Sequence, residues 1–276
     1  MLINFTKMHG LGNDFVVIDL ITQTVRLRAG QIRRIADRHL GIGCDQILLI
    51  EPPTRTTADF YLRIFNANGD EVEHCGNGAR CAARFFYDMG FSNNPTLEAD
   101  CLAGPLSFVM DEQGDVTVNM GIPTFHPTKV PFTSNTEALQ YPITVENAEY
   151  NMSVLSMGNP HAVLQVPDIA LAPVKKLGPI ISKHTSFPKE TNVGFMQVMN
   201  KHEIGLRVYE RSVGETLACG SGACAAVVAG IRLGLLNSPV SVVFSKGRLQ
   251  ITWAGFNTPV MMTGPATRVF IGRFRL

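Results

Sequence analysis

Two short segments of the chain alternate between apolar and polar side chains with the period of a β-strand. They span residues 60–66 and 206–211, and both contain the β-branched and aromatic residues that strands favour. Each segment is followed by a polar loop, a Cys-Gly-x-Gly sequence and an alanine-rich stretch that predicts a helix. Glycines beyond these stretches predict the helix ends, near Gly90 for the first and near Gly230 or Gly234 for the second.

The two segments belong to an internal repeat with two motifs in each half. The motif pairs are residues 63–83 with 207–227 and residues 12–17 with 158–163. The first pair aligns at an offset of 144 with seven identities in 21 positions, and the second pair aligns at an offset of 146. Chance similarity of short Gly- and Ala-rich pieces is the alternative, but the order and the spacing of both motifs recur. The alignment places Cys75 opposite Cys219 and predicts two similar α+β domains.

Proline and glycine positions indicate where the chain crosses between the domains. Residues 121–131 contain three prolines and predict a linker or an edge segment, and Gly264-Pro265 predicts a second crossing. We therefore expect one domain of residues 1–119 plus 265–276 and another of residues 120–264. The active site is expected in the cleft between these two pseudo-symmetric α/β domains.

Composition and charge narrow the function classes. The chain has 276 residues, of which 45% are hydrophobic and 17% charged, as in ordinary globular proteins. The net charge is +1 and no basic run occurs, so we expect no nucleic-acid partner. Residues 1–7 lack the pattern of a signal peptide, and the apolar stretch 218–236 is interrupted by Arg232 and several glycines. We expect a cytoplasmic protein that does not cross a membrane.

The six cysteines contain no Cys-x-x-Cys pair, and six are too few for a disulfide scaffold in a chain of this length. Their spacing does not fit a zinc site, so we expect neither a metal nor a disulfide framework. Four of them have no supporting motif and are expected to pack as small hydrophobic residues. These four are Cys44, Cys81, Cys101 and Cys224.

Cys75 and Cys219 differ from these four because each precedes two glycines at a predicted helix start. The unpaired N–H groups and the macrodipole at a helix N-terminus stabilise a thiolate, and glycines let an anionic ligand approach the backbone. A reaction that inverts a stereocentre needs a base on one face of the carbon and an acid on the other. Two equivalent cysteines supply one thiolate and one thiol. The sequence therefore predicts a cofactor-independent two-base racemase or epimerase of a small amino acid.

Motifs along nearly the whole chain resemble the diaminopimelate epimerase family. These motifs are residues 8–15 (MHGLGNDF), 43–46 (GCDQ), 63–69 (RIFNANG), 75–80 (CGNGAR), 158–161 (GNPH), 192–193 (NV), 210–211 (ER) and 218–223 (ACGSGA). The resemblance implies interconversion of LL- and meso-2,6-diaminopimelate for lysine and cell-wall precursor synthesis, without pyridoxal phosphate or metal. It also implies two domains, each a mixed sheet wrapped around a central helix, and a homodimer.

The resemblance assigns roles to individual residues. It makes Cys219 the proton acceptor and Cys75 the donor in the LL-to-meso direction, and it gives His161 and Glu210 a part in setting the thiol pKa values. The implied substrate contacts are Asn13, Gln46, Asn66, Gly76, Asn77, Asn159, Asn192, Glu210, Arg211, Gly220 and Ser221. Among these, Arg211 can hold the carboxylate of the non-reacting end as a fork. For any single asparagine a turn residue is the alternative.

The repeat is broken at two positions of the implied site. His161 stands opposite Phe15, and Glu210 stands opposite Asn66, so the two halves differ as a substrate with one reacting end requires. Near the C-terminus Phe270 stands where the family carries a tyrosine that supports dimerisation. It keeps an apolar contact but lacks the hydroxyl.

Two other functions remain open at this point. A proline or hydroxyproline racemase shares the fold and the paired cysteines, but its first cysteine motif usually has histidine where Asn77 stands. It also has less need of a residue like Arg211. A thiol redox or binding protein that merely keeps the scaffold would exchange no proton with a substrate carbon.

Overall fold

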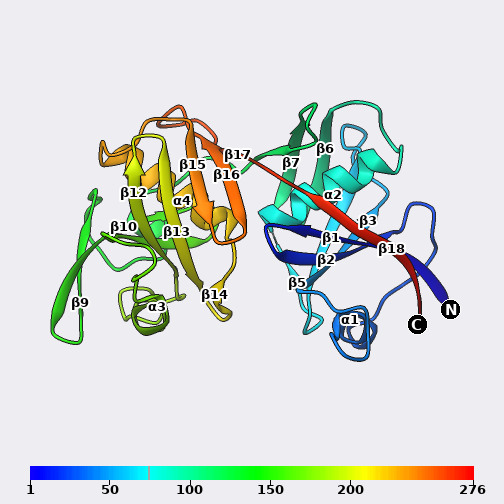
Figure 1. The fold of residues 1–276 in the computed structure, drawn as a ribbon, viewed down its shortest axis with the longest axis horizontal. Coiled ribbons are helices and arrows are strands. Elements are labelled where there is room, and N and C mark those ends of the chain that lie inside the picture. Colours follow the sequence, from blue (N-terminus) through cyan, green and yellow to red (C-terminus); the bar gives the residue numbers. More distant parts are fainter. Residues whose placement is uncertain (74) are drawn as a thin grey trace. The chain divides into compact units, whose positions relative to one another are not determined.

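The computed structural model describes residues 1–73 and 75–276. These form two compact units (Figure 1), unit 1 with residues 1–119 and 263–276 and unit 2 with residues 120–262. The chain leaves unit 1 after Asn119 and returns after Met262, two residues before the crossing expected at Gly264-Pro265.

Unit 1 is a mixed sheet with two described helices. Its strands are β1 (Leu2–Gly10), β2 (Asn13–Asp19), β3 (Gln46–Glu51), β4 (Phe60–Asn66), β5 (Glu71–Val72), β6 (Thr96–Cys101), β7 (Gly104–Met110), β8 (Val116–Asn119) and β18 (Thr267–Arg275), and its helices are α1 (Ala29–Ala36) and α2 (Gly76–Asp88). The pairing runs β18-β1-β2-β3-β4-β6-β7-β8, with β2–β3 and β4–β6 parallel and the others antiparallel. Helix α2 contacts β1, β2, β3, β4, β7 and β8, so the sheet wraps around it.

Unit 2 repeats this plan. Its strands are β9 (Tyr141–Val145), β10 (Ala148–Ser156), β11 (Pro160–Gln165), β12 (Asn192–Asn200), β13 (Glu203–Glu210), β14 (Gly214–Thr216), β15 (Val240–Phe244) and β16 (Gly247–Thr252), and its helices are the 3-10 turn η1 (Pro127–Lys129), α3 (Val174–Ser182) and α4 (Gly220–Arg232). Strand β17 (Met261–Gly264) contains the return to unit 1. The parallel pairs β11–β12 and β13–β15 match β2–β3 and β4–β6. Helix α4 contacts β10, β11, β12, β13, β15 and β16.

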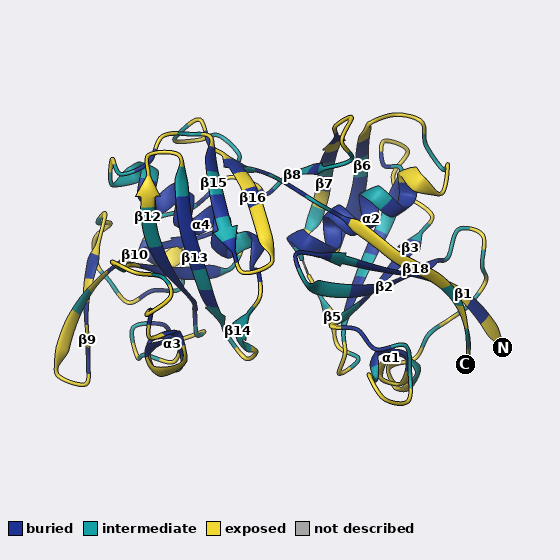
Figure 2. Ribbon diagram, viewed as in Figure 1, coloured by how far each residue is buried: buried dark blue, intermediate teal, exposed yellow. Residues whose placement is uncertain are grey.

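The two central helices lie deep in their units, and alanines and glycines recur along both. All of the alanines and glycines of α2 and α4 are buried (Figure 2), which allows the surrounding strands to approach the helix backbone closely. Burial of the apolar side chains of these helices contributes about 25 cal/mol per Å² of apolar area. The prediction of a mixed sheet around a central helix in each domain is confirmed.

The predicted elements agree with the structure except at a few ends. The strand predicted over residues 60–66 is β4, whereas the one predicted over 206–211 ends one residue earlier and begins three residues earlier, as β13. Gly90 and Gly234 follow the C-caps of α2 and α4 with φ of 74° and 72°. Gly230 is wrong as an end, since it lies inside α4 against Leu236.

An ion pair recurs at equivalent positions of the two units. Arg63 Nε donates to Glu71 Oε1 at 2.8 Å, joining β4 to β5, and Arg207 Nε donates to Glu215 Oε1 at 2.7 Å, joining β13 to β14. These four residues are identities in the internal repeat. The repeat therefore preserves the contact that ties each strand pair together before the cysteine.

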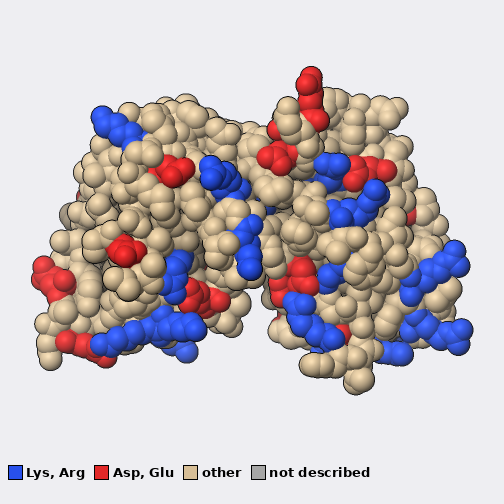
Figure 3. Space-filling model, viewed as in Figure 1, with Lys and Arg blue, Asp and Glu red and all other residues tan. Residues whose placement is uncertain are grey.

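Charged side chains of both signs lie interspersed on the face shown in Figure 3. The nearly equal numbers of basic and acidic residues, 24 and 23, give the net charge of +1. No helix among the described residues is long and apolar enough to span a membrane.

Candidate active site

Each predicted catalytic cysteine directly precedes the central helix of its unit. Cys75 is the N-cap of α2 with φ −149° and ψ 108°, and Cys219 is the N-cap of α4 with φ −120° and ψ 112°. An extended backbone at this position turns the side chain toward the first helical turn. The backbone N–H of Gly78 donates to Cys75 Sγ at 3.4 Å, and Cys219 Sγ lies 3.6 Å from Ser221 Oγ.

The second glycine of each Cys-Gly-x-Gly motif is required for packing. A Cβ at Gly78 would lie 3.1 Å from Leu48 Cδ2, and one at Gly222 would lie 3.1 Å from Val208 Cγ2. Both distances are tighter than ordinary Cβ contacts, so any larger residue would push the helix start away from the strand. Close approach between helix and strand is thus a reason for these glycines that the sequence did not reveal.

In unit 1, strand pairing brings two of the predicted substrate contacts together. Gln46 begins β3 and is in register with Asn66 at the end of β4, and Gln46 Nε2 donates to Asn66 Oδ1 at 2.9 Å. The other side-chain atom, Oε1 of Gln46, is buried and has no hydrogen-bond partner among the described residues. A buried amide oxygen without a partner is costly unless a ligand donates to it.

Asn13 and Asn77 lie beside the first cysteine. Asn13, at the start of β2, has its Oδ1 3.8 Å from Cys75 Sγ, and Asn77 Nδ2 donates to the same oxygen at 3.4 Å. The helix residue Asn77 is itself fixed by Arg80, whose Nη2 donates to Asn77 Oδ1 at 2.9 Å. The side chains named around Cys75 therefore include two amides whose oxygens each accept a hydrogen bond. Gly76, the first residue of α2, is buried.

In unit 2, the equivalent strand pairing brings His161 beside Asn192. These residues are in register in the parallel pair β11–β12, as Phe15 and Gln46 are in β2–β3. His161 Nε2 lies 2.9 Å from Asn159 Oδ1, and Asn159 Nδ2 donates to Ser221 Oγ at 3.4 Å. Hydrogen bonds thus run from the imidazole to the first turn of α4. Gly220, the first residue of that turn, is buried.

Glu210 and Arg211 follow each other at the end of β13 and serve different contacts. Thr216 Oγ1 donates to Glu210 Oε1 at 2.5 Å. The backbone N–H of Arg211 donates to Asn192 Oδ1 at 3.0 Å, and Arg211 Nη1 donates to the carbonyl of Lys189 at 3.2 Å. Five N–H donors are available on a guanidinium, so the one bond to Lys189 leaves donors for a carboxylate ligand.

Burial shifts the pKa values of two predicted site residues in unit 2. Burial, and then the neighbouring Glu210 carboxylate, raise the pKa of the Cys219 thiol well above its ordinary value, while the N–H of Gly222 lowers it by less. Burial also raises the pKa of Glu210, against the hydrogen bond from Thr216. For Cys219 the expectation that the helix start lowers the thiol pKa is therefore wrong in its net direction, since desolvation outweighs the helix N-terminus.

His161 is held neutral by the same cause. Burial, followed by the charge of Arg211, lowers the pKa of His161 to about 3. The side chain is only 1% exposed, and its one described side-chain partner is an amide. A neutral imidazole at this position can share a hydrogen bond with Asn159 without adding a charge to the site.

The four cysteines expected to pack as hydrophobic residues are all buried. Burial raises the pKa of Cys44 and of Cys81 to about 12 in each case, so neither ionises near neutral pH. The structural interpretation of Cys44, Cys81, Cys101 and Cys224 is confirmed. Among the described residues no cluster of three or more histidine, cysteine, aspartate or glutamate side chains could hold a metal ion.

Comparison with known proteins identifies the family. The model of the diaminopimelate epimerase family matches residues 5–126 and 153–269. A diaminopimelate epimerase of Nitrosospira multiformis is 54% identical over 276 residues, which is all of this chain and 99% of that protein. One of Nitrosomonas europaea is 53% identical over the full length of both chains.

The chain belongs to the diaminopimelate epimerase family. The matched ranges of this family contain every predicted site residue, from Asn13 to Ser221. The resemblance on which those residues were chosen is therefore confirmed at the level of the family.

Solved structures of more distant proteins share the fold. A hydroxyproline epimerase from Agrobacterium vitis superposes with a TM-score of 0.71 at 14% identity, covering 99% of this chain and 92% of that one. A PhzF-family phenazine biosynthesis protein from Bacillus anthracis superposes with a TM-score of 0.69 at 14% identity over the full length of both. At such identities the fold alone is shared, and it extends beyond the diaminopimelate epimerase family.

Two polar residues that bond predicted site residues were not singled out from the sequence. Thr216 lies in β14 and bonds Glu210, and Asp45 belongs to a quoted motif of the diaminopimelate epimerase family but had no role assigned. For Thr216 the strand pairing β13–β14 supplies the missing information, because it places Thr216 opposite Val208, two residues before Glu210 on β13. A signal for Asp45 was its position next to Gln46.

Proposed function

We propose that the protein interconverts LL- and meso-2,6-diaminopimelate by proton transfer between two cysteines and the α-carbon, without a cofactor. The observation that carries the proposal is the placement of Cys75 and Cys219 at equivalent helix starts in two repeated units. Family membership supports the substrate, since the relatives at 50–54% identity are named diaminopimelate epimerases.

In the LL-to-meso direction, the Cys219 thiolate removes the α-proton and becomes a thiol. The electron pair left on the carbon is delocalised into the substrate carboxylate, and the helix N-termini stabilise the charge that develops there. The Cys75 thiol then donates its proton to the opposite face and becomes the thiolate. The reverse reaction exchanges the two roles, and no group is oxidised or reduced.

His161 and Glu210 set the environment of the Cys219 thiol in this proposal. The high pKa of the buried thiol makes its thiolate a strong base once it forms, because the proton affinity of sulfur rises with its pKa. Closure of the site around a charged substrate would change the solvation that raises this pKa.

The remaining predicted contacts include amide side chains and one cation. Gln46 Oε1, buried without a described partner, is suited to accept from a substrate ammonium. Arg211 is suited to bind the carboxylate of the non-reacting centre, which the substrate carries and proline lacks. The proposed substrate contacts are Asn13, Gln46, Asn66, Gly76, Asn77, Asn159, Asn192, Glu210, Arg211, Gly220 and Ser221.

The proposal includes a role in lysine and peptidoglycan-precursor synthesis, a cytoplasmic location and a homodimer. On β18 the side chains of Val269, Phe270 and Ile271 are about half exposed or more. Contiguous exposed apolar residues of this kind are commonly covered by a protein partner. Light scattering on the purified protein tests the dimer, and a monomer at micromolar concentration would contradict it.

One experiment tests the proposed function. The protein is incubated, reduced, with LL-diaminopimelate in heavy water, and α-deuterium incorporation and meso product are followed together. We expect both to appear, while L-proline under the same conditions gains no deuterium. Fresh reduced protein without exchange would overturn the proposal, and exchange with proline alone would favour the hydroxyproline-type enzyme.

A further inference from the structure

A directional chain of hydrogen bonds passes through the two amides beside Cys75. Arg80 Nη2 donates to Asn77 Oδ1 at 2.9 Å, Asn77 Nδ2 donates to Asn13 Oδ1 at 3.4 Å, and Asn13 Nδ2 donates to Asp45 Oδ2 at 3.0 Å. In each of these hydrogen bonds the acceptor lies on the side of Asp45. The series of hydrogen bonds ends at Asp45 because an ionised carboxylate accepts hydrogen bonds and donates none.

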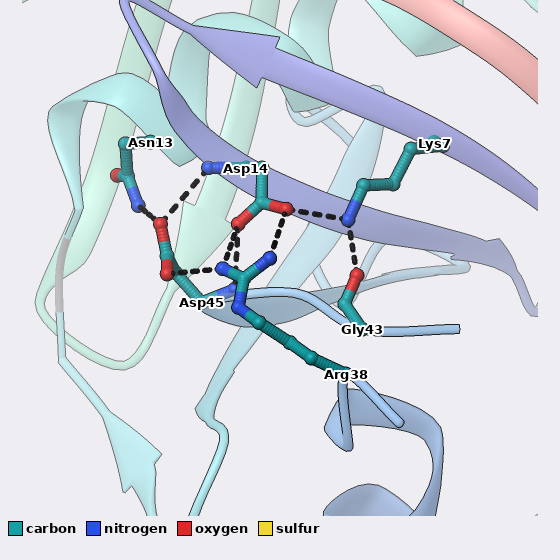
Figure 4. A network of polar contacts seen from close by, with 6 residues as sticks. All are labelled: Lys7, Asn13, Asp14, Arg38, Gly43 and Asp45. Carbon is teal, nitrogen blue, oxygen red and sulfur yellow. Dashed lines mark hydrogen bonds and ion pairs between the residues drawn. The ribbon is translucent and has the colours of Figure 1, made fainter. Parts of the chain in front are cut away.

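Asp45 is itself fixed by a network of charges (Figure 4). Arg38 Nη2 donates to Asp45 Oδ1 at 2.7 Å, and the backbone N–H of Asp14 donates to Asp45 Oδ2 at 3.1 Å. Arg38 also holds the Asp14 carboxylate through two bonds, and Lys7 pairs with that carboxylate at 2.6 Å. The Asp45 oxygen that faces Asn13 therefore has little freedom to rotate away.

The orientation of the Asn13 amide follows from this arrangement. A flipped amide would place Asn13 Oδ1 against a carboxylate oxygen and Asn13 Nδ2 against the Nδ2 of Asn77, so two hydrogen bonds would become repulsive contacts. In the observed orientation Oδ1 of Asn13 lies 3.8 Å from Cys75 Sγ. The amide thus presents an acceptor, not a donor, at the start of α2.

We propose that Asp45 is a positioning residue that fixes the Asn13 amide with its oxygen toward Cys75, so that Asn13 accepts a hydrogen bond from a substrate ammonium. The inference rests on the proposed function, in which Asn13 contacts diaminopimelate. Asp45 acts through Asn13 and touches no substrate itself. Removing Asp45 frees the amide to rotate, and a donor then faces the substrate ammonium in part of the molecules.

A double-mutant cycle tests this role. Asp45→Ala raises the KM for LL-diaminopimelate by about tenfold and changes kcat by less than about threefold, as expected when a ground-state hydrogen bond is lost. In an Asn13→Ala background the same substitution changes KM by less than about twofold, because the amide that Asp45 orients is gone. Equal factors in both backgrounds, or an Asn13→Ala variant with unchanged KM, would overturn the proposal.

A matched control and a second variant complete the design. Asp100→Ala removes another arginine-paired carboxylate of unit 1, held by three bonds from Arg55, and is expected to change KM by the same small factor, less than about twofold, in both backgrounds. If Asp45→Ala does not fold, Asp45→Leu carries the cycle, since leucine keeps the branched shape without an acceptor, with the same requirement that its effect disappears without Asn13. Wild-type turnover is measured first. Its absence refutes the proposed function, whereas additive factors in an active enzyme refute only the role of Asp45.

Discussion

The surroundings of Cys75 in unit 1 and of Cys219 in unit 2 form two half-sites. The two half-sites have similar backbone arrangements and different side chains. Around Cys75 the described neighbours include the neutral amides Asn13 and Asn77, backed by a network of Asp, Arg and Lys side chains that reaches solvent. Around Cys219 the neighbours include a carboxylate and a serine, and a buried imidazole lies two hydrogen bonds beyond the serine. The internal repeat preserved the frame that holds each cysteine, while the side chains around it diverged. The proposed substrate, which has one reacting end, requires such a divergence.

The largest effect is expected at the cysteines themselves. Cys75→Ala and Cys219→Ala are each expected to lower turnover by about 10³-fold or more, because each removes one of the two groups proposed to transfer the proton. Cys81→Ala, inside α2, lowers it by less than about threefold. The measurement is α-deuterium exchange with LL-diaminopimelate. Comparable losses in all three variants would mean that the cysteines are structural.

The second largest effect is expected at Glu210, whose carboxylate lies near Cys219. Glu210→Gln lowers turnover by about 10²-fold, and it moves the alkylation of Cys219 to lower pH, because the carboxylate is the second cause, after burial, that raises the pKa of this thiol. Alkylation is measured peptide by peptide with mass spectrometry across pH 7–11. Thr216→Val keeps the Glu210 carboxylate and is the control. In this variant the alkylation of Cys219 is expected to remain at high pH. An unmoved Cys219 profile in Glu210→Gln would contradict the contact.

A third prediction concerns the dependence of stability on pH. The pKa of His161 is lowered from 6.5 to about 3 by burial, so below pH 6.5 the unfolded chain binds a proton that the folded chain refuses. The stability associated with this group is present above pH 6.5 and falls by about 1.4 kcal/mol per pH unit between 6.5 and 3.

His161→Phe places the residue of the other half, Phe15, at this position and removes that slope. Urea unfolding at pH 6.5 and 4.5 measures it, and the loss of stability in wild type is expected to exceed the loss in the variant by about 2 kcal/mol. Substituting the exposed His202 with glutamine is expected to leave the slope unchanged. A slope retained in His161→Phe would show that other groups carry it.

The smallest effect tests the shared frame. Glu71→Gln and Glu215→Gln break equivalent ion pairs that are partly exposed, and each is expected to lower the free energy of unfolding by less than about 1 kcal/mol. Thermal unfolding of both variants beside wild type measures the change. Effects that differ by more than about 2 kcal/mol would show that the repeat does not preserve the energetics of the pair.

The sequence predicted the strands and the central helices better than it predicted the surroundings of the two cysteines. Period-two alternation and the internal repeat identified β4, β13 and the two central helices, because hydrophobic spacing is a local property of the chain. The motifs identified the family. The raised pKa of Cys219 could not be predicted, since it depends on how deeply the folded unit buries the thiol and on a carboxylate nine residues away in sequence. The bond between Asp45 and Asn13 likewise exists only after β2 and the segment before β3 are brought together.

The last strand of the chain has a consequence for biosynthesis. Strand β1 lies between β2 and β18, so β1 keeps one open edge until residues 267–275 have been synthesised. Unit 2 is contiguous and has all of its residues earlier. Unit 2 can therefore fold before unit 1, although it is synthesised after most of unit 1, and unit 1 is completed only when β18 joins β1.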